Sequence, residues 1–179
     1  GALTPWVNMG YGSGRSSNLE ARNEGFQSIA SDYRPGIVNR RFAGAAGIGA
    51  LNLGAGTGTG IGTNGLNNRV VYGLGVNMTP AAWEKLTLGA QFWHFNLQRN
   101  TATNTVIGAT TQRGAKHLGS EYGVTADWKH SENVKVGLGA AIFAPGGFVK
   151  QTIANTNTAA INTGNNPATL AFADFTVKF

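Results

Sequence analysis

The chain has 179 residues, of which only 12% are charged, and it contains 27 glycines, no cysteine and a formal net charge of +6. This length fits one domain or one small barrel, and a chain without cysteine cannot form disulfides, thiol nucleophiles or cysteine-ligated metal sites. No apolar run reaches the ~18 to 20 residues that a membrane-spanning helix needs, which excludes a helical membrane protein. The basic residues are spread out without interleaved aromatic residues, so we expect no nucleic-acid partner.

Six segments alternate apolar residues with polar or small ones at a period of two, the pattern of a strand whose two faces meet different surroundings. Each approaches the ~9 to 11 residues with which a tilted strand crosses an outer membrane. Pro5 weakens the pattern in the first segment, and in the third the alternation blurs at Trp93, where we expect an aromatic girdle. In chain order, the segments are residues 3–12, 69–78, 86–97, 120–128, 133–143 and 170–179.

The clearest alternation is in the last segment, LAFADFTVKF. One of its faces is purely apolar and ends on Phe179, whereas the other carries Asp174 and Lys178. A C-terminal aromatic residue that closes an amphipathic strand resembles the signal by which outer-membrane barrels are recognised for insertion. Phe179 is therefore a candidate contact for the barrel-assembly machinery.

Short and long connections alternate along the chain. The links after the second and fourth segments, MTPAAWEKL and KHSEN, are short enough for periplasmic turns, whereas residues 13–68, 98–119 and 144–169 form long links. The predicted fold class is therefore all-β, an antiparallel transmembrane β-barrel with long extracellular loops. We expect it in a bacterial outer membrane, in contact with lipid and lipopolysaccharide. A soluble β-sandwich is the alternative for six amphipathic strands, but these strands are too long and carry aromatic residues at both ends.

Six strands are too few for a closed single-chain barrel, which needs at least 8. Either residues 13–68 contain two more strands, or other strands or chains complete the barrel. We expect residues 1–179 to be a single β-barrel region, the C-terminal portion of a larger barrel. The Gly- and Ala-rich part of residues 13–68 predicts an extracellular excursion.

Several strings resemble the C-terminal part of the alginate export (AlgE-like) family of outer-membrane porins. They are WVNMGYGSG, FQSIASDYRPG, LNNRVVYGLGVNMTPAAWEKLTLGAQFWHF, HLGSEYGVTADWKHSENVKVGLGAAIFAPGGF and FADFTVKF, which together extend over nearly the whole chain. The resemblance implies a monomeric barrel of many more than six strands, with a charged lumen that a substrate crosses passively. The first long link has few acidic residues, so specificity for alginate does not carry over.

If the apolar face meets lipid, the opposite face points into the barrel and supplies the candidate pore-lining residues. For each of them, an interstrand ion pair is a more ordinary role than a substrate contact. The candidates are Arg69, Gln91, Glu121, Asp127, Lys135, Asp174 and Lys178.

Three loop arginines, Arg34, Arg40 and Arg41, are candidate anion contacts. They are expected either to bind lipopolysaccharide or to fold inward as a positive constriction, with a solvated loop surface as the ordinary alternative.

Catalysis has little support, and we predict neither an enzyme nor a cofactor. His94 and His117 are far apart in the sequence, and Ser120 and Ser131 are expected to serve turns rather than a nucleophilic dyad. Two functions remain. One is a passive channel for small or polymeric, anionic solutes; the other is a small closed barrel with a structural or adhesive role, acting through its loops or as part of a larger assembly.

Overall fold

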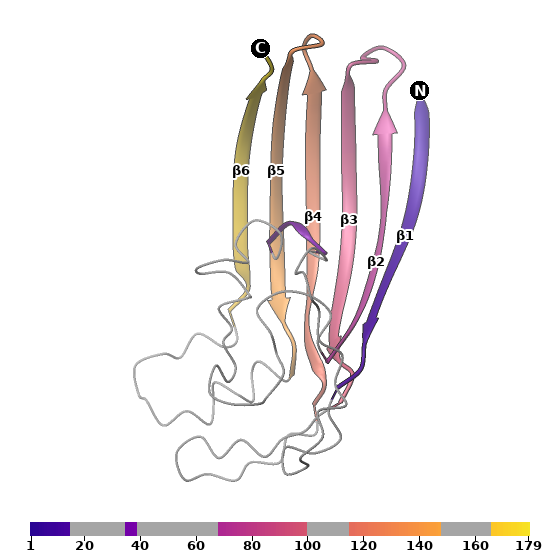
Figure 1. Ribbon diagram of the computed structural model, residues 1–179, viewed down its shortest axis with the longest axis vertical. Coiled ribbons are helices and arrows are strands. Elements are labelled where there is room, and N and C mark those ends of the chain that lie inside the picture. The colour runs from indigo at the N-terminus through magenta and orange to yellow at the C-terminus, as the bar shows by residue number, and fades with distance from the viewer. Residues whose placement is uncertain (15–34, 39–67, 100–114, 148–165) are drawn as a thin grey trace.

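The computed structural model describes residues 1–14, 35–38, 68–99, 115–147 and 166–179. These residues form one six-stranded antiparallel sheet in which each strand pairs with its neighbours in the sequence (Figure 1). The all-β antiparallel prediction is thereby confirmed. The strands are β1 (Ala2–Gly12), β2 (Arg69–Thr79), β3 (Leu86–Leu97), β4 (His117–Lys129), β5 (Val134–Pro145) and β6 (Ala168–Val177).

Two short turns and both chain termini lie at one end of the sheet, which we call the turn end; the opposite end is the loop end (Figure 1). In the turn between β2 and β3, the N–H of Trp83 donates to the carbonyl of Pro80 at 3.0 Å. In the turn between β4 and β5, the Ser131 hydroxyl accepts the N–H of Val134 at 3.1 Å. Ser131 therefore has the turn role that the sequence predicts.

The register aligns the apolar residues of all six strands on one side of the sheet, the outer face. Val7, Leu74, Phe92, Tyr122 and Ile142, for example, follow one another across five strands. Their neighbours on this side are exposed, and an exposed apolar surface of this extent is the kind that contacts lipid. Large apolar side chains exposed on the outer face are Leu3, Val7, Met9, Tyr11, Tyr72, Leu74, Met78, Tyr122, Val124, Trp128, Leu138, Ile142, Phe175 and Val177.

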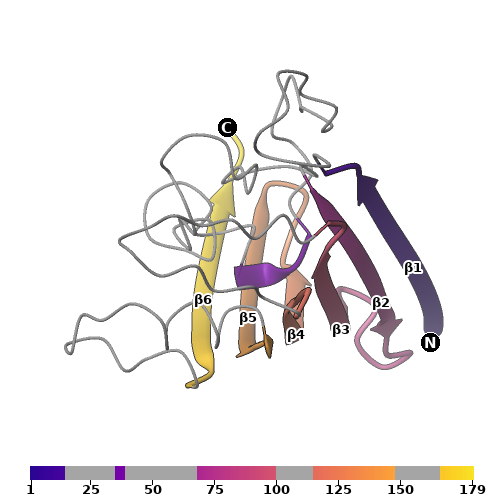
Figure 2. The ribbon, with the colours of Figure 1, turned by 90° about the horizontal axis from the view of Figure 1, so that it is seen from below.

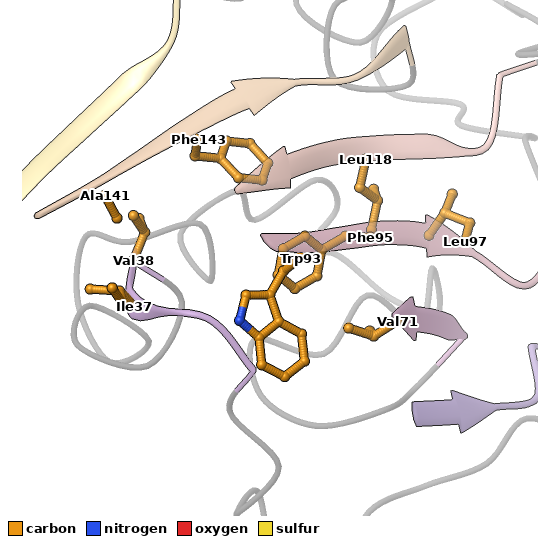
Figure 3. Packing of buried hydrophobic residues seen from close by; sticks show 9 residues of the cluster. All are labelled: Ile37, Val38, Val71, Trp93, Phe95, Leu97, Leu118, Ala141 and Phe143. Carbon is orange, nitrogen blue, oxygen red and sulfur yellow. The ribbon is translucent and has the colours of Figure 1, made fainter. Parts of the chain in front are cut away.

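The buried core lies on the opposite side, the inner face, toward the loop end. Its side chains come from strands β2 to β5 and from residues 35–38, which are far from the strands in sequence (Figure 3). The cluster consists of Ile37, Val38, Val71, Trp93, Phe95, Leu97, Leu118, Ala141 and Phe143.

Residues 35–38 belong to the long link between β1 and β2. Figure 2 looks at the sheet from one end and shows this segment lying across β5 and β4, with β1 and β6 at the two edges of the sheet. This segment lies on the sheet because Ile37 and Val38 bury their apolar side chains there, each being 6% exposed. The Gly- and Ala-rich part of the link, for which the sequence predicts an extracellular excursion, lies outside the described residues.

Within the described residues, β1 and β6 each pair on one side only, so the sheet is open. The described residues contain no helix that is both long and apolar enough to cross a membrane.

Candidate functional site

The inner face has two zones of different polarity. The zone toward the turn end carries hydroxyl and charged side chains, including Thr79 and Thr87, whose hydroxyl oxygens lie 3.4 Å apart. The zone toward the loop end is the buried cluster. The candidate pore-lining residues are divided between these zones, and their surroundings differ accordingly.

Asp127 and Lys135 form an interstrand ion pair in the polar zone. The Nζ atom of Lys135 lies 2.8 Å from Oδ1 of Asp127, and the two side chains are 56% and 40% exposed. Asp127 is the partner of Gly137 in the β4–β5 register, so the ion pair is diagonal. Because Gly137 has no side chain, the Asp127 carboxylate lies close above its backbone. The structure therefore shows Asp127 and Lys135 in an interstrand ion pair, the ordinary role that the sequence predicts for them.

Asp174 and Lys178 continue the polar zone toward the edge of the sheet. Asp174 faces Gly137 across the β5–β6 pair and is half-buried. Lys178 follows the last strand, and its backbone N–H donates to the carbonyl of Asn133 at 2.9 Å while its side chain is exposed. The terminal Phe179 is fully exposed.

Gln91 lies at the boundary of the two zones and is half-buried. Its amide oxygen accepts the indole N–H of Trp93 at 3.2 Å. The Trp93 ring in turn lies 5.5 Å from that of Trp6, at an angle of 43°. Gln91 therefore orients an aromatic pair on the inner face. The period-two pattern of the sequence predicts that both tryptophans lie on the inner face, but it does not predict that their rings are in contact.

Glu121 differs most from the expectation of a water-facing pore residue, since its side chain is fully buried. Its carboxylate accepts the backbone N–H of Ile37 and, at 3.2 Å, that of Val38. A buried carboxylate is costly unless hydrogen-bond donors surround it. The loop segment supplies these donors, so Glu121 attaches residues 35–38 to the sheet.

Arg69, at the start of β2, is also buried, being 7% exposed at the loop end of the inner face. Next to it, the amide of Asn68 exchanges two hydrogen bonds with the backbone of Arg99, at 2.8 and 2.9 Å, and thereby joins the ends of β2 and β3. Arg34, Arg40 and Arg41 lie outside the described residues.

A third group of polar residues lies on the outer face near the loop end. The hydroxyl of Ser120 lies 3.0 Å from Nδ1 of His94 and 3.3 Å from Nε2 of His117, and the two imidazoles stack with centroids 4.4 Å apart. The two histidines are therefore in contact although they are far apart in the sequence. Ser120 lies within β4 and not, as the sequence predicts for it, in a turn. The register shifts between Phe95 and Asn96, and this irregularity brings His117 to the side of His94.

The cluster of His94, His117 and Ser120 gives no reason to predict an enzyme. Ser120 is only 9% exposed, and its hydroxyl is shared between two rings instead of being directed at open space. Within the part of the chain that the structure describes, no group of three or more metal-ligating side chains is present.

Comparison with known proteins supports the assignment that the short strings suggested. No curated protein and no solved structure matches the chain. A family model described as alginate export does match, over residues 3–162, which include β2 to β5 and all of β1 except Ala2. The match covers far more than half of the 179 residues, and the two-faced antiparallel sheet has the form of a barrel wall. The chain belongs to the alginate export family.

Proposed function

We propose that the chain forms part of the wall of an outer-membrane channel through which hydrophilic solutes cross passively. The observation that carries this proposal is the contrast between the two faces of one sheet. The outer face exposes large apolar side chains such as Val7, 85% exposed, and Val124, 57% exposed. The inner face carries an ion pair that is accessible to water. Such a surface suits a wall between lipid and an aqueous interior.

The sheet edges support the further proposal that this region is the C-terminal portion of a larger barrel. A sheet edge in lipid would leave backbone N–H and C=O groups without partners, which a bilayer does not tolerate. Other strands or another chain are therefore needed beside β1 and β6. Recognition of Phe179 by the barrel-assembly machinery, and contact of the outer face with lipid and lipopolysaccharide, belong to the same proposal.

The charges of the polar zone favour small or polymeric anionic solutes. The described residues of this zone carry three lysines, Lys129, Lys135 and Lys178, against two acids, Asp127, which is paired with Lys135, and the half-buried Asp174. Fixed charges that line an aqueous passage bias the permeating ions by sign.

Planar-bilayer recording of the full gene product tests this function. We expect stepwise conductance with a preference for anions, and Lys135→Glu should shift the reversal potential toward cations. Arg40→Glu and Arg41→Glu test whether the loop arginines add to the same preference. An intact barrel without conductance would overturn the channel and favour a sealed barrel with a structural or adhesive role, for which the cluster on the inner face is the supporting observation.

A further inference from the structure

We propose that His94 and His117 form a binding site for a transition-metal dication such as Cu²⁺, Ni²⁺ or Zn²⁺, on the outer face at the loop end of the sheet. The site goes beyond the channel function, because neither histidine lies on the face assigned to the passage. Its two protein ligands come from the neighbouring strands β3 and β4. A bound ion therefore fastens these strands to each other beside the register shift between Phe95 and Asn96.

The two imidazole rings direct nitrogen atoms at one point. Nδ1 of His94 lies 3.0 Å, and Nε2 of His117 3.3 Å, from the same atom, the hydroxyl oxygen of Ser120. The rings are nearly parallel, with centroids 4.4 Å apart and an angle of 18° between their planes. A metal bound by two imidazoles needs nitrogens that converge in this way, each at ~2.0–2.1 Å from the ion. Small side-chain rotations, which leave the strands in place, bring both nitrogens to one ion.

The close stacking of the two rings favours neutral imidazole, the form that binds a metal. Two imidazolium ions in such contact would repel each other, so the stack is stable only if at least one ring is neutral. In the neutral pair, the Ser120 hydroxyl donates its single proton to one ring and accepts an N–H from the other. One nitrogen lone pair is thus present already, and the second forms when the metal displaces the N–H proton.

Neighbouring residues hold both rings in position. The side chain of Asn96 forms a hydrogen bond with His94, and an outer hydrogen bond of this kind orients a ligating imidazole. The ring of Phe92 stacks with the same imidazole, with centroids 6.4 Å apart. On the other side of the pair, a Cβ atom at Gly146 would overlap the backbone of His117. The two ligands are therefore preorganised by contacts on three strands.

The ligand type selects the class of metal. Imidazole nitrogens suit Cu²⁺, Ni²⁺ and Zn²⁺, whereas Mg²⁺ and Ca²⁺ prefer oxygen ligands. Structural zinc sites have four protein ligands, so a site with two imidazoles keeps water in its remaining positions and exchanges its ion readily. His94 and His117 are both half-buried, which leaves them accessible to such an ion.

Metal titration tests the site. The full gene product, without a histidine tag, is folded in zwitterionic phosphatidylcholine vesicles and titrated with Ni²⁺ in a calorimeter. His94→Ala and His117→Ala should each raise the Kd at least about 10-fold. His130→Ala is the matched control and should leave the Kd unchanged. His130 also lies beside an aromatic ring, that of Trp128 at 4.9 Å, but it follows β4 at the turn end, away from the pair. Equal Kd values in the wild type and both folded variants of the pair would overturn the proposal.

Copper spectroscopy and metal-dependent stability give readouts that two merely structural histidines would not change. The EPR spectrum of bound Cu²⁺ should show coupling to two imidazole nitrogens in the wild type and to one in either variant of the pair. Ni²⁺ should raise the urea midpoint of the wild type but not that of His94→Ala, and Mg²⁺ should raise neither. His94→Gln serves if His94→Ala does not fold. A Cu²⁺ spectrum that the variants leave unchanged, or an equal midpoint shift with Mg²⁺ and Ni²⁺, would overturn the site.

Discussion

The indole ring of Trp93 on β3 lies directly against Gly73, its partner on β2, so closely that a Cβ atom at position 73 would overlap the six-membered ring. Gly73→Ala must therefore displace Trp93 from its contact with Trp6 and from its hydrogen bond to Gln91. Overpacking of this kind costs about 1–3 kcal/mol. We expect that loss in urea unfolding of the folded protein in lipid vesicles.

Gly137→Ala is the matched control for Gly73→Ala, because both glycines lie on the inner face within a strand. A Cβ atom at Gly137 would meet Oδ1 of Asp127 at 3.2 Å and Cβ of Asp174 at 3.8 Å, contacts that flexible side chains can relieve. This variant should unfold near the wild-type midpoint. Equal losses for the two variants would contradict the role assigned to the Trp93 contact.

Adjacent residues of β4 should respond oppositely to a lysine. Val124 is exposed on the outer face and Thr125 lies on the inner face, opposite Gly89 and Gly139. A lysine near the middle of a lipid-facing surface costs about 2–4 kcal/mol in a transmembrane barrel. Val124→Lys should therefore lose that much stability in vesicles, whereas Thr125→Lys should lose less than about 1 kcal/mol. The reverse order would mean that the two faces have been assigned the wrong way round.

The strands were predictable from the sequence because lipid on one side and the interior on the other impose a period of two on every residue. β3 has the predicted bounds, and β2 begins at the predicted Arg69. β4 begins at His117, three residues before its predicted start at Ser120, because its pairing with β3 continues past the register shift at Asn96. Beyond this shift, the period-two pattern no longer predicts on which face of the sheet a side chain lies. The Lys135 ion pair was also foreseeable, since opposite charges on neighbouring strands of one face fall within reach.

The attachment of residues 35–38 to the sheet was not predictable in the same way. The contact between Glu121 and Ile37 joins residues 84 positions apart, and a local pattern does not specify the distant surface to which a link returns. Two signals were nevertheless present in the sequence. Ile37 and Val38 follow Pro35 and Gly36, and Glu121 is an acid whose next two neighbours on the same strand face are the small residues Gly123 and Thr125.

The ion pair of Lys135 and Asp127 should contribute little to stability. Both side chains are more than a third exposed, so water and salt screen their attraction, and exposed pairs are worth about 0.2–1 kcal/mol. A double-mutant cycle with Lys135→Met and Asp127→Asn should give a coupling energy in this range that falls as salt rises. A coupling well above 1 kcal/mol, or one that salt leaves unchanged, would show that the pair is drier than the structure indicates.

Replacing Ser120 by alanine should lower the free energy of unfolding more than replacing Ser131, although both serines form hydrogen bonds. Ser120→Ala removes a hydroxyl shared by His94 and His117 in a site that is 9% exposed, and each lost bond contributes about 0.5–1.5 kcal/mol. Ser131→Ala removes one exposed bond to the backbone of Val134, which water replaces. We expect a loss of about 1–2 kcal/mol for Ser120→Ala and about 0.5 kcal/mol or less for Ser131→Ala in the same unfolding assay.

Because the stacked rings depend on the shared hydroxyl, Ser120→Ala should also change the imidazole NMR signals of both histidines, which Ser131→Ala should leave in place. Unchanged signals in Ser120→Ala would show that stacking alone holds the two rings together.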